Sequence, residues 1–259
     1  MSEKNNSGCR TSKPEPVGPG KVALVTGGSA RVGATIIKNL HSDGYDVGLH
    51  YFQSETDAHL LVAELNEKRP NSAFALKQDL TEKDAATKIH GHFLEKRKRI
   101  DLLVNNASIF KKTRTEAPSP AEWDAFFSVN SRTPWMLALC FAPMLRKHRG
   151  TIINITDIHA QSPRKDYSLY CISKAALDAI TRALALELAP DIRVNGIAPG
   201  AILWAASESE IVREQALAST PLKRKGEPID IAEAVIYLAT AKYVSGQILN
   251  IDGGRSLAP

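Results

Sequence analysis

The chain has 259 residues, with 33 Lys and Arg against 28 Asp and Glu, which gives a net charge of +5. A hydrophobic fraction of 43% and a charged fraction of 24% are ordinary for a globular protein, and the length suits one large α/β domain. The basic residues are scattered, which argues against a nucleic-acid partner. No apolar run approaches the roughly 20 residues that a membrane-spanning helix needs.

The start of the chain, residues 1–20, is rich in Ser, Pro, Gly and Lys and has no apolar core. This composition is typical of a disordered arm and not of a secretory signal. The three cysteines show no paired spacing, which indicates a reducing compartment and hence a cytoplasmic location. His90 and His92 have no acidic or Cys partner placed for a metal, so no metal site is expected.

A glycine-rich turn follows the first apolar segment. Residues 22–25 predict a short buried strand, and the turn after it leads into a helix. Glycines between a strand and a helix let the backbone approach a pyrophosphate, and the helix N-terminus adds N–H groups and partial positive charge. Plain turn chemistry is the alternative, but the position after a first strand favours a dinucleotide site at Gly27, Arg31, Val32 and Gly33.

The end of the second predicted strand, residues 45–51, indicates which dinucleotide binds. Sites for NAD place an acid at this point to hold the ribose 2′-hydroxyl, but the sequence from Leu49 to Ser54 contains no carboxylate. Arg31, with His50 and Ser54, can instead surround a 2′-phosphate, with Tyr51 beside them. NADPH is therefore the expected cofactor.

Strands and helices continue to alternate along the rest of the chain. Helices are predicted over 55–68 and 82–98, with a final helix that follows Ile231 and ends at Leu238. Strands are predicted over 73–77, 101–105, 150–155 and 192–197, with a last strand and closing turn over 246–254. Ser119, Pro120 and Glu122 form a capping box that begins a further, long helix. This alternation predicts one doubly wound parallel sheet flanked by helices, with the ligand beyond the carboxyl ends of the strands.

A tyrosine and a lysine stand one helical turn apart after the predicted strand at 150–155. From about Ser168 the apolar residues have helical spacing, which places Tyr170 and Lys174 on one face. A neighbouring ammonium lowers the pKa of a phenol, so such a Tyr can exchange a proton near neutral pH. The same spacing occurs on many solvated helices, so the pair alone does not establish a site.

Tyr170-Cys-Ile-Ser-Lys174, together with the spacing Gly27-x-x-x-Arg31-x-Gly33, resembles the short-chain dehydrogenase/reductase family. The resemblance implies a single Rossmann-type NADP-binding domain over residues 21–259. It also implies further cofactor-binding positions, which are Asp79, Leu80, Asn106, Ala107, Ser108, Tyr170, Lys174, Pro199 and Gly200.

Asn130 matches the asparagine that, in this family, kinks a helix and holds a water next to the active-site lysine. The resemblance therefore adds Asn130 to the catalytic residues Asp157, Tyr170 and Lys174. In most relatives this long helix and the Tyr170 helix form a four-helix contact between subunits, which implies a homotetramer.

One position departs from the general family pattern. In most members a Ser lies thirteen residues before the Tyr and bonds the substrate carbonyl, and here that residue is Asp157. A carboxylate near neutral pH accepts hydrogen bonds but donates none, so it is a poor partner for a ketone oxygen. It better suits a substrate with N–H donors, or one whose ring nitrogen receives a proton through water. We expect Asp157 to raise the pKa of Tyr170 while Lys174 lowers it, so that the groups titrate together.

Asp157, the run 106–108, Phe110 and the strand end 49–51 together resemble the pteridine reductases, which reduce pterins, and often folates, at ring C=N bonds with NADPH. The resemblance implies that Phe110 stacks on a pterin held against the nicotinamide and that Tyr170 donates the proton. Plain core packing of Phe110 is the alternative.

The segment 201–219 is expected to form a lid over the substrate, with Leu203 and Trp204 on its inner face or packed within the lid itself. The expected partner is a small pterin or folate. The predicted substrate-binding residues are Ser108, Phe110, Asp157, Tyr170, Leu203 and Trp204.

Two other functions fit much of the same sequence. A reductase of 3-oxoacyl thioesters or small ketones shares every motif except Asp157 and Phe110. A non-catalytic NADP(H) sensor is the second alternative. The intact Tyr170, Lys174 and Asn130 argue against it, because a sensor does not need a proton donor.

Overall fold

The computed structural model describes residues 20–113, 115–117, 119–204 and 209–257. The arm expected at residues 1–20 therefore lies outside the described residues, except for Gly20.

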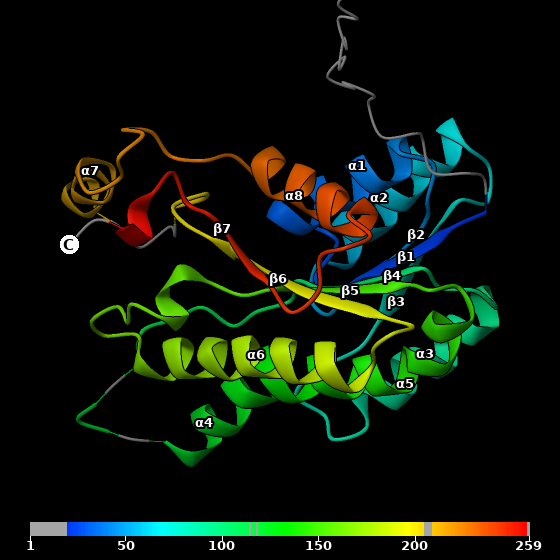
Figure 1. The fold of residues 1–259 in the computed structure, drawn as a ribbon, viewed down its shortest axis with the longest axis horizontal. Coiled ribbons are helices and arrows are strands. Elements are labelled where there is room, and N and C mark those ends of the chain that lie inside the picture. Colours follow the sequence, from blue (N-terminus) through cyan, green and yellow to red (C-terminus); the bar gives the residue numbers. More distant parts are fainter. Residues whose placement is uncertain (1–19, 114, 118, 205–208, 258–259) are drawn as a thin grey trace, which may run out of the picture.

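Within the described residues, seven strands form one sheet in the order β3-β2-β1-β4-β5-β6-β7, and every neighbouring pair is parallel (Figure 1). This confirms the single doubly wound sheet. The strand order reverses between β1 and β4, and α/β folds of this kind bind ligands beyond the carboxyl ends of the strands at such a point. The strands are β1 Val22–Val25, β2 Asp46–Tyr51, β3 Ala73–Lys77, β4 Leu102–Asn105, β5 Thr151–Ile155, β6 Arg193–Pro199 and β7 Ile248–Ile251.

Helices cover both faces of the sheet: α1, α2 and α8 lie on one face, and α3, α5 and α6 lie on the other (Figure 1). Among the described residues, no helix is both long and apolar enough to cross a membrane. The helices are α1 Arg31–Ser42, α2 Glu55–Lys68, α3 Ala85–Lys96, α4 Pro120–Phe127, α5 Thr133–Lys147, α6 Ser168–Glu187, α7 Glu210–Ala218 and α8 Pro228–Thr240.

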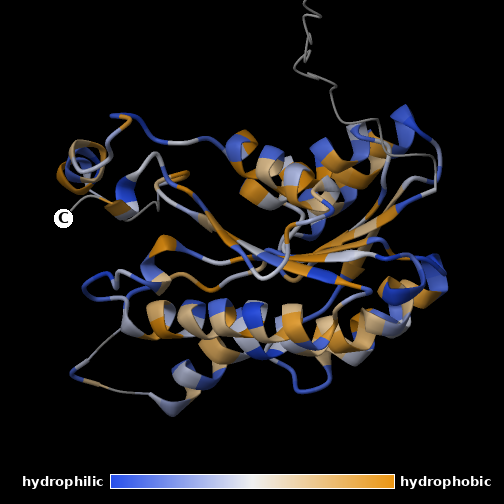
Figure 2. Cartoon of the chain, in the orientation of Figure 1, coloured by the Kyte–Doolittle hydropathy of each residue, from blue (hydrophilic) through white to orange (hydrophobic). Residues whose placement is uncertain are grey.

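The core is divided into two layers by the sheet, and apolar residues form much of the strands between them (Figure 2). Every residue of β1, β4 and β5 is buried, which is why these strands read as continuous apolar runs and not as alternating ones. In the lower layer of Figure 1, Phe93 of α3 meets Phe74 and Phe141 edge-on, with ring centroids 5.6 and 5.1 Å away. The aromatic cluster fixes α3 and α5 against the sheet.

Two of the helices that differ from their predicted extents do so for identifiable reasons. The helix predicted over 82–98 begins only at Ala85, because one carboxylate oxygen of Asp79 accepts hydrogen bonds from the backbone N and the hydroxyl of Thr81, both at 2.8 Å, and holds the preceding residues in a turn. The long helix begins where its cap predicts, with the Ser119 hydroxyl accepting from the Glu122 N–H at 3.3 Å. A π-helical turn over Ser128–Arg132 then divides it into α4 and α5, which confirms the predicted kink at Asn130.

The Phe93→Ala variant tests the aromatic cluster. Because Phe93 is fully buried and packs against two other rings, we expect the free energy of unfolding to fall by about 3–5 kcal/mol. Urea denaturation of the two proteins measures this difference. The matched control is His92→Ala, an exposed neighbour on the same helix, which should leave the unfolding midpoint almost unchanged. Equal effects of the two changes would contradict the assigned core.

Candidate active site

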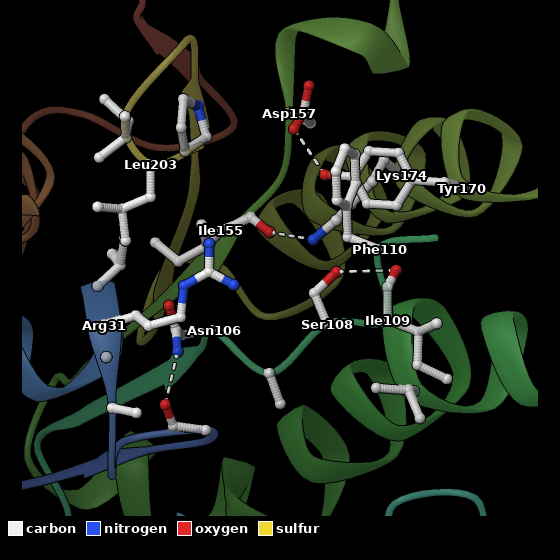
Figure 3. Close-up of a pocket in the computed structure, with 18 of the residues that line it drawn as sticks. Arg31, Asn106, Ser108, Ile109, Phe110, Ile155, Asp157, Tyr170, Lys174 and Leu203 are labelled. Carbon is white, nitrogen blue, oxygen red and sulfur yellow. Dashed lines mark hydrogen bonds between the residues drawn. The ribbon is translucent and has the colours of Figure 1, made fainter. Parts of the chain in front are cut away.

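One cavity of about 710 Å³ lies beyond the carboxyl ends of the strands and is lined by the loops that follow them (Figure 3). Apart from Asn130, all of the residues predicted for the site line this cavity, so the structure brings them together; their division between cofactor and substrate stays a prediction. These lining residues are Gly27, Arg31, Val32, Gly33, His50, Tyr51, Ser54, Asp79, Leu80, Asn106, Ala107, Ser108, Phe110, Asp157, Tyr170, Lys174, Pro199, Gly200, Leu203 and Trp204.

The glycine loop is held against the end of β4. The Asn106 side-chain amide donates to the carbonyls of Thr26 and Gly27, at 2.9 and 3.0 Å. Gly27 has a φ of +62°, and a Cβ on Gly33 would lie 2.0 Å from the Gly27 oxygen, so both positions require glycine. The residue before α1 is Ala30, which has no capping side chain, so the N–H groups of the first turn are available to an anion. The loop therefore fits the pyrophosphate of a dinucleotide.

Arg31 occupies the first position of α1 in a left-handed conformation, with a φ of +53°. Figure 3 shows its side chain reaching into the cavity. Ser54, which follows β2, lines the same cavity. A guanidinium and a hydroxyl beside the cofactor loop suit a phosphate better than a bare ribose hydroxyl.

His50 has a different role from the one predicted. Its Nδ1 accepts from the Gly27 N–H at 3.2 Å, and its Nε2 donates to the Gln78 carbonyl at 2.8 Å. Burial lowers the pKa of His50 from 6.5 to about 4, so the ring is neutral at pH 7. The structure therefore corrects the prediction that His50 contacts a 2′-phosphate. Both ring nitrogens are used within the protein, and His50 instead fixes the position of the glycine loop.

The phenol of Tyr170 donates to Asp157 Oδ2 at 2.6 Å, and Asp157 Oδ1 accepts from the His159 N–H at 2.8 Å (Figure 3). Burial raises the pKa of Tyr170 well above its ordinary value of 10, and the carboxylate of Asp157 raises it further. The phenol consequently keeps its proton at neutral pH. The predicted upward effect of Asp157 on this pKa is present.

Lys174 is not among the largest effects on the Tyr170 pKa, where it was predicted to lower that pKa. The Lys174 ammonium lies 5.8 Å from the centre of the Tyr170 ring and donates to the Ile155 carbonyl at 2.7 Å, whereas Arg164 provides the opposing charge. Burial lowers the pKa of Lys174 to about 8, although Asp157 and Asp178 act in the other direction. Most Lys174 side chains therefore remain charged at pH 7.

Asn130 is fully buried and lies behind the cavity, in the π-helical turn. Its Oδ1 accepts from the Ile109 N–H at 2.8 Å, and its Nδ2 donates to the Ile109 carbonyl at 3.1 Å and to the Ser173 hydroxyl at 2.9 Å. Both amide hydrogens are thus used in tying the loop after β4 to α6. The water expected beside Lys174 stays a prediction.

Phe110 is part of an aromatic wall, and not of the core. Its ring stacks on Tyr167 at 4.8 Å with an interplanar angle of 18°, and the Tyr170 ring meets it edge-on at 4.7 Å. Phe110 remains 40% exposed and lines the cavity. Tyr167 covers one face of the Phe110 ring, so a flat ligand cannot stack on that face.

Three basic side chains that were not predicted also line the cavity. His159 and Arg164 belong to the segment between β5 and α6, and Arg255 follows β7. The position of 158–167 between Asp157 and Tyr170 was a usable signal for the first two, since both ends of that segment are fixed at the site. Nothing in the local sequence marks Arg255. Among the described residues, no group of three or more His, Cys, Asp or Glu is placed to hold a metal ion.

A glycine loop at the amino end of α1 and a Tyr–Lys pair on α6 that share one cavity define an oxidoreductase that uses a nicotinamide dinucleotide. Comparison with known families gives the same class in narrower terms. A family model described as "Enoyl-(Acyl carrier protein) reductase" matches residues 28–256, and the chain belongs to the short-chain dehydrogenase/reductase family, whose members use NAD(P)H.

Two curated relatives are about equally similar to the chain. Pteridine reductase 1 of Leishmania tarentolae is 33% identical across 91% of this chain and 96% of its own length. The 3-oxoacyl-[acyl-carrier-protein] reductase FabG of Staphylococcus epidermidis is 34% identical across 90% of this chain and 98% of its own length. Among solved structures, FolM alternative dihydrofolate reductase 1 of Brucella canis, complexed with NADP, has a TM-score of 0.84 and 32% identity, covering 92% of this chain and 95% of that one.

The buried neutral His50 predicts a pH-dependent stability. Between pH 6.5 and about 4 the unfolded chain takes up a proton that the folded protein refuses, so stability falls as the pH falls through this range. The contribution lost by pH 4 is on the order of 3 kcal/mol. Urea unfolding of the wild type and of His50→Gln at pH 7 and pH 4.5 measures it: the variant should lose less stability on acidification than the wild type.

His92→Gln, a change at an exposed histidine, is the control and should behave as the wild type does. If His50→Gln and the wild type lose equal stability on acidification, the neutral state assigned to His50 is wrong.

Proposed function

We propose that this enzyme reduces pterins with NADPH, adding a hydride to a ring carbon and a proton to the adjacent nitrogen, so that a dihydropterin becomes a tetrahydropterin. The proposal depends on one observation, the 2.6 Å hydrogen bond between the Tyr170 hydroxyl and Asp157. A carboxylate that directly contacts the proton donor can also accept from the N–H groups of a heterocycle, whereas a ketone offers it no hydrogen. The similarity to a pteridine reductase and to a dihydrofolate reductase supports the same substrate class.

NADPH, when bound, supplies the hydride. Tyr170 holds the proton at neutral pH because burial and Asp157 both raise the pKa of its phenol. When a ring nitrogen of the substrate becomes basic, the hydroxyl exchanges Asp157 for that nitrogen and gives up its proton. The resulting phenolate, buried beside a carboxylate, is unfavourable, so it recovers a proton from solvent by the path that Asp157 orients.

Lys174 has a positioning role in this scheme. One hydrogen of its ammonium is donated to the Ile155 carbonyl, and two others are available to the nicotinamide ribose hydroxyls. On the substrate side, the face of Phe110 that points away from Tyr167 stacks on the pterin. The Ser108 hydroxyl, Leu203 and Trp204 complete the substrate site around it.

We also propose that α5 and α6 form the subunit contact of a homotetramer. Trp135 and Leu139 on α5, and Ile172 on α6, are large apolar side chains that are 40%, 37% and 46% exposed. Apolar surface of this kind is stabilised by burial against a second copy of the chain.

Reduction of 3-oxoacyl thioesters is the alternative function, favoured by the 34% identity to FabG. In that reaction a hydrogen-bond donor beside Tyr170 would polarise the carbonyl oxygen. Asp157 cannot act as this donor while it is ionised and accepting from the Tyr170 hydroxyl, so the two functions make opposite predictions for Asp157 variants.

NADPH oxidation assays with dihydrobiopterin, dihydrofolate and an acetoacetyl thioester test the proposal. We expect turnover with the pterins and little with the thioester. Tyr170→Phe should lower kcat about 10²- to 10⁴-fold, since it removes the proton donor. Asp157→Ser should lower pterin turnover sharply. The control Tyr237→Phe, an exposed phenol on α8, should have no effect. Turnover of the thioester alone, or a gain in thioester activity with pterin activity intact in Asp157→Ser, would favour the alternative.

The choice of cofactor is tested separately. We expect the wild type to have a higher kcat/KM with NADPH than with NADH. Arg31→Leu should lower the kcat/KM for NADPH about tenfold or more, because a charge-assisted hydrogen bond to phosphate is lost. The value for NADH should change little. Lys38→Leu, which removes a cation from the same helix outside the cavity, is the matched control. Equal losses with both cofactors in Arg31→Leu would contradict the assignment of Arg31 to the 2′-phosphate.

A further inference from the structure

Arg164 is the cation closest to the aromatic wall at the substrate end of the cavity. Its guanidinium carbon lies 4.6 Å from the centre of the Tyr167 ring and 6.0 Å from that of Phe110. The side chain is half-buried and lines the cavity. Arg164 therefore adjoins the ring on which the proposed pterin stacks.

The local backbone holds Arg164 firmly in this place. The Arg164 N–H donates to the Cys171 sulfur at 3.4 Å, and the Arg164 carbonyl accepts from the Tyr167 N–H at 3.2 Å. These bonds fold the segment back onto the first turns of α6. A guanidinium above an aromatic ring is further held by the cation–π attraction, and it carries five N–H donors in a planar fork.

Basic side chains outnumber acidic ones among the described residues that line the cavity. The carboxylate of Asp157 accepts from the Tyr170 hydroxyl and the His159 N–H, and its charge is opposed by Lys174 as well as by Arg164. Among the described residues that line the cavity, the other acidic side chain is Asp79, which follows β3 on the cofactor side. An anionic substituent at the aromatic wall would thus meet more positive than negative charge.

We infer that Arg164 binds an anionic group on the tail of the pterin, so that the enzyme prefers substrates with a carboxylate or a phosphate beyond the ring over those with an uncharged hydroxyalkyl tail. This inference rests on the proposed pterin reduction and narrows its substrate class. A bicyclic ring stacked on Phe110 extends beyond the phenyl ring, and in the proposed orientation its substituent points toward Arg164. The guanidinium then recognises a carboxylate or phosphate through paired N–H donors.

A purely structural role is the alternative, in which Arg164 only covers Tyr167. Such a role affects the stability of the fold and the turnover of all substrates alike. An anion-binding role affects KM or the dissociation constant for charged substrates alone, so the two are separable by comparing substrates that differ only in charge.

Two matched substrate pairs provide this comparison, each with a charged and an uncharged member. Dihydroneopterin and its monophosphate differ by a phosphate, and dihydrofolate and its dimethyl ester differ by the tail carboxylates. In Arg164→Leu we expect KM to rise about tenfold for both charged members, or for the one whose anion Arg164 binds, and to stay within about twofold for the uncharged members. The pair with the larger change identifies the anion.

Two further variants separate local binding from a general effect of charge. Arg164→Lys keeps the charge and should keep most of the preference for charged substrates. Lys165→Leu removes the same charge from the adjacent exposed residue, which does not line the cavity, and should change neither KM. The loss of Arg164 also removes an effect that lowers the pKa of Tyr170, but this acts on kcat for every substrate and not on the ratio of KM values within a pair.

The dissociation constants of the same ligands, measured by calorimetry on the NADP⁺-bound enzyme, distinguish failure of this inference from failure of the proposed function. Tighter binding of the charged member that is lost in Arg164→Leu supports the inference even if no pterin is turned over. Equal binding of charged and uncharged members by the wild type, or an equal loss for both in Arg164→Leu, overturns it, whether or not pterins are reduced.

Discussion

The buried hydrogen bond between Tyr170 and Asp157 is the interaction on which the chemistry of this site depends. A phenol is normally made reactive by a nearby cation that favours its ionised form, and here a carboxylate at 2.6 Å and burial do the reverse. The proton of the pair therefore lies in the hydrogen bond from Tyr170 to Asp157. A neutral side chain in place of Asp157 would instead offer a hydrogen-bond donor to a carbonyl. In the proposed mechanism, the raised pKa keeps Tyr170 protonated until a ring nitrogen of the substrate has become basic enough to take the proton.

Buried polar ties determine how the loops around this pair are placed. Parallel strands bring their carboxyl ends to one edge of the sheet, but the loops beyond them have no ladder of their own. His50 fixes the glycine loop to β3 through Gly27 and Gln78, and Asn106 fixes the same loop to β4. Each tie uses a side chain that is buried or half-buried and neutral at pH 7, so the cofactor side of the cavity is built without burying an uncompensated charge.

Much of the fold could be predicted because its signals are local. The bounds of β1, α2 and β3 and the cap at Ser119 follow from short stretches of sequence, and the kink at Asn130 followed from the family resemblance. The residues that line the cavity followed from motifs at strand ends. What could not be predicted depends on partners far along the chain: the second hydrogen bond of His50, the distance of the Lys174 ammonium from the Tyr170 phenol, and the contact of Arg164 with two rings. The four-residue spacing of Tyr170 and Lys174 does not show how deeply either group is buried, and burial determines both the sign of the Tyr170 pKa shift and the neutral state of His50.

The amide of Asn130 has a mechanical consequence for substrate choice. It joins the loop carrying Ser108 and Phe110 to α6, and so links the proposed stacking surface to the proposed proton donor. A bulkier heterocycle cannot be accommodated by moving Phe110 away from Tyr170 without leaving a fully buried amide unpaired. Any adjustment to the size of the substrate must therefore come from the opposite wall, where Leu203 and Trp204 follow β6 and are only half-buried. Divergence of substrate range among enzymes built in this way is thus expected to concentrate after β6, while the α6 side stays constant.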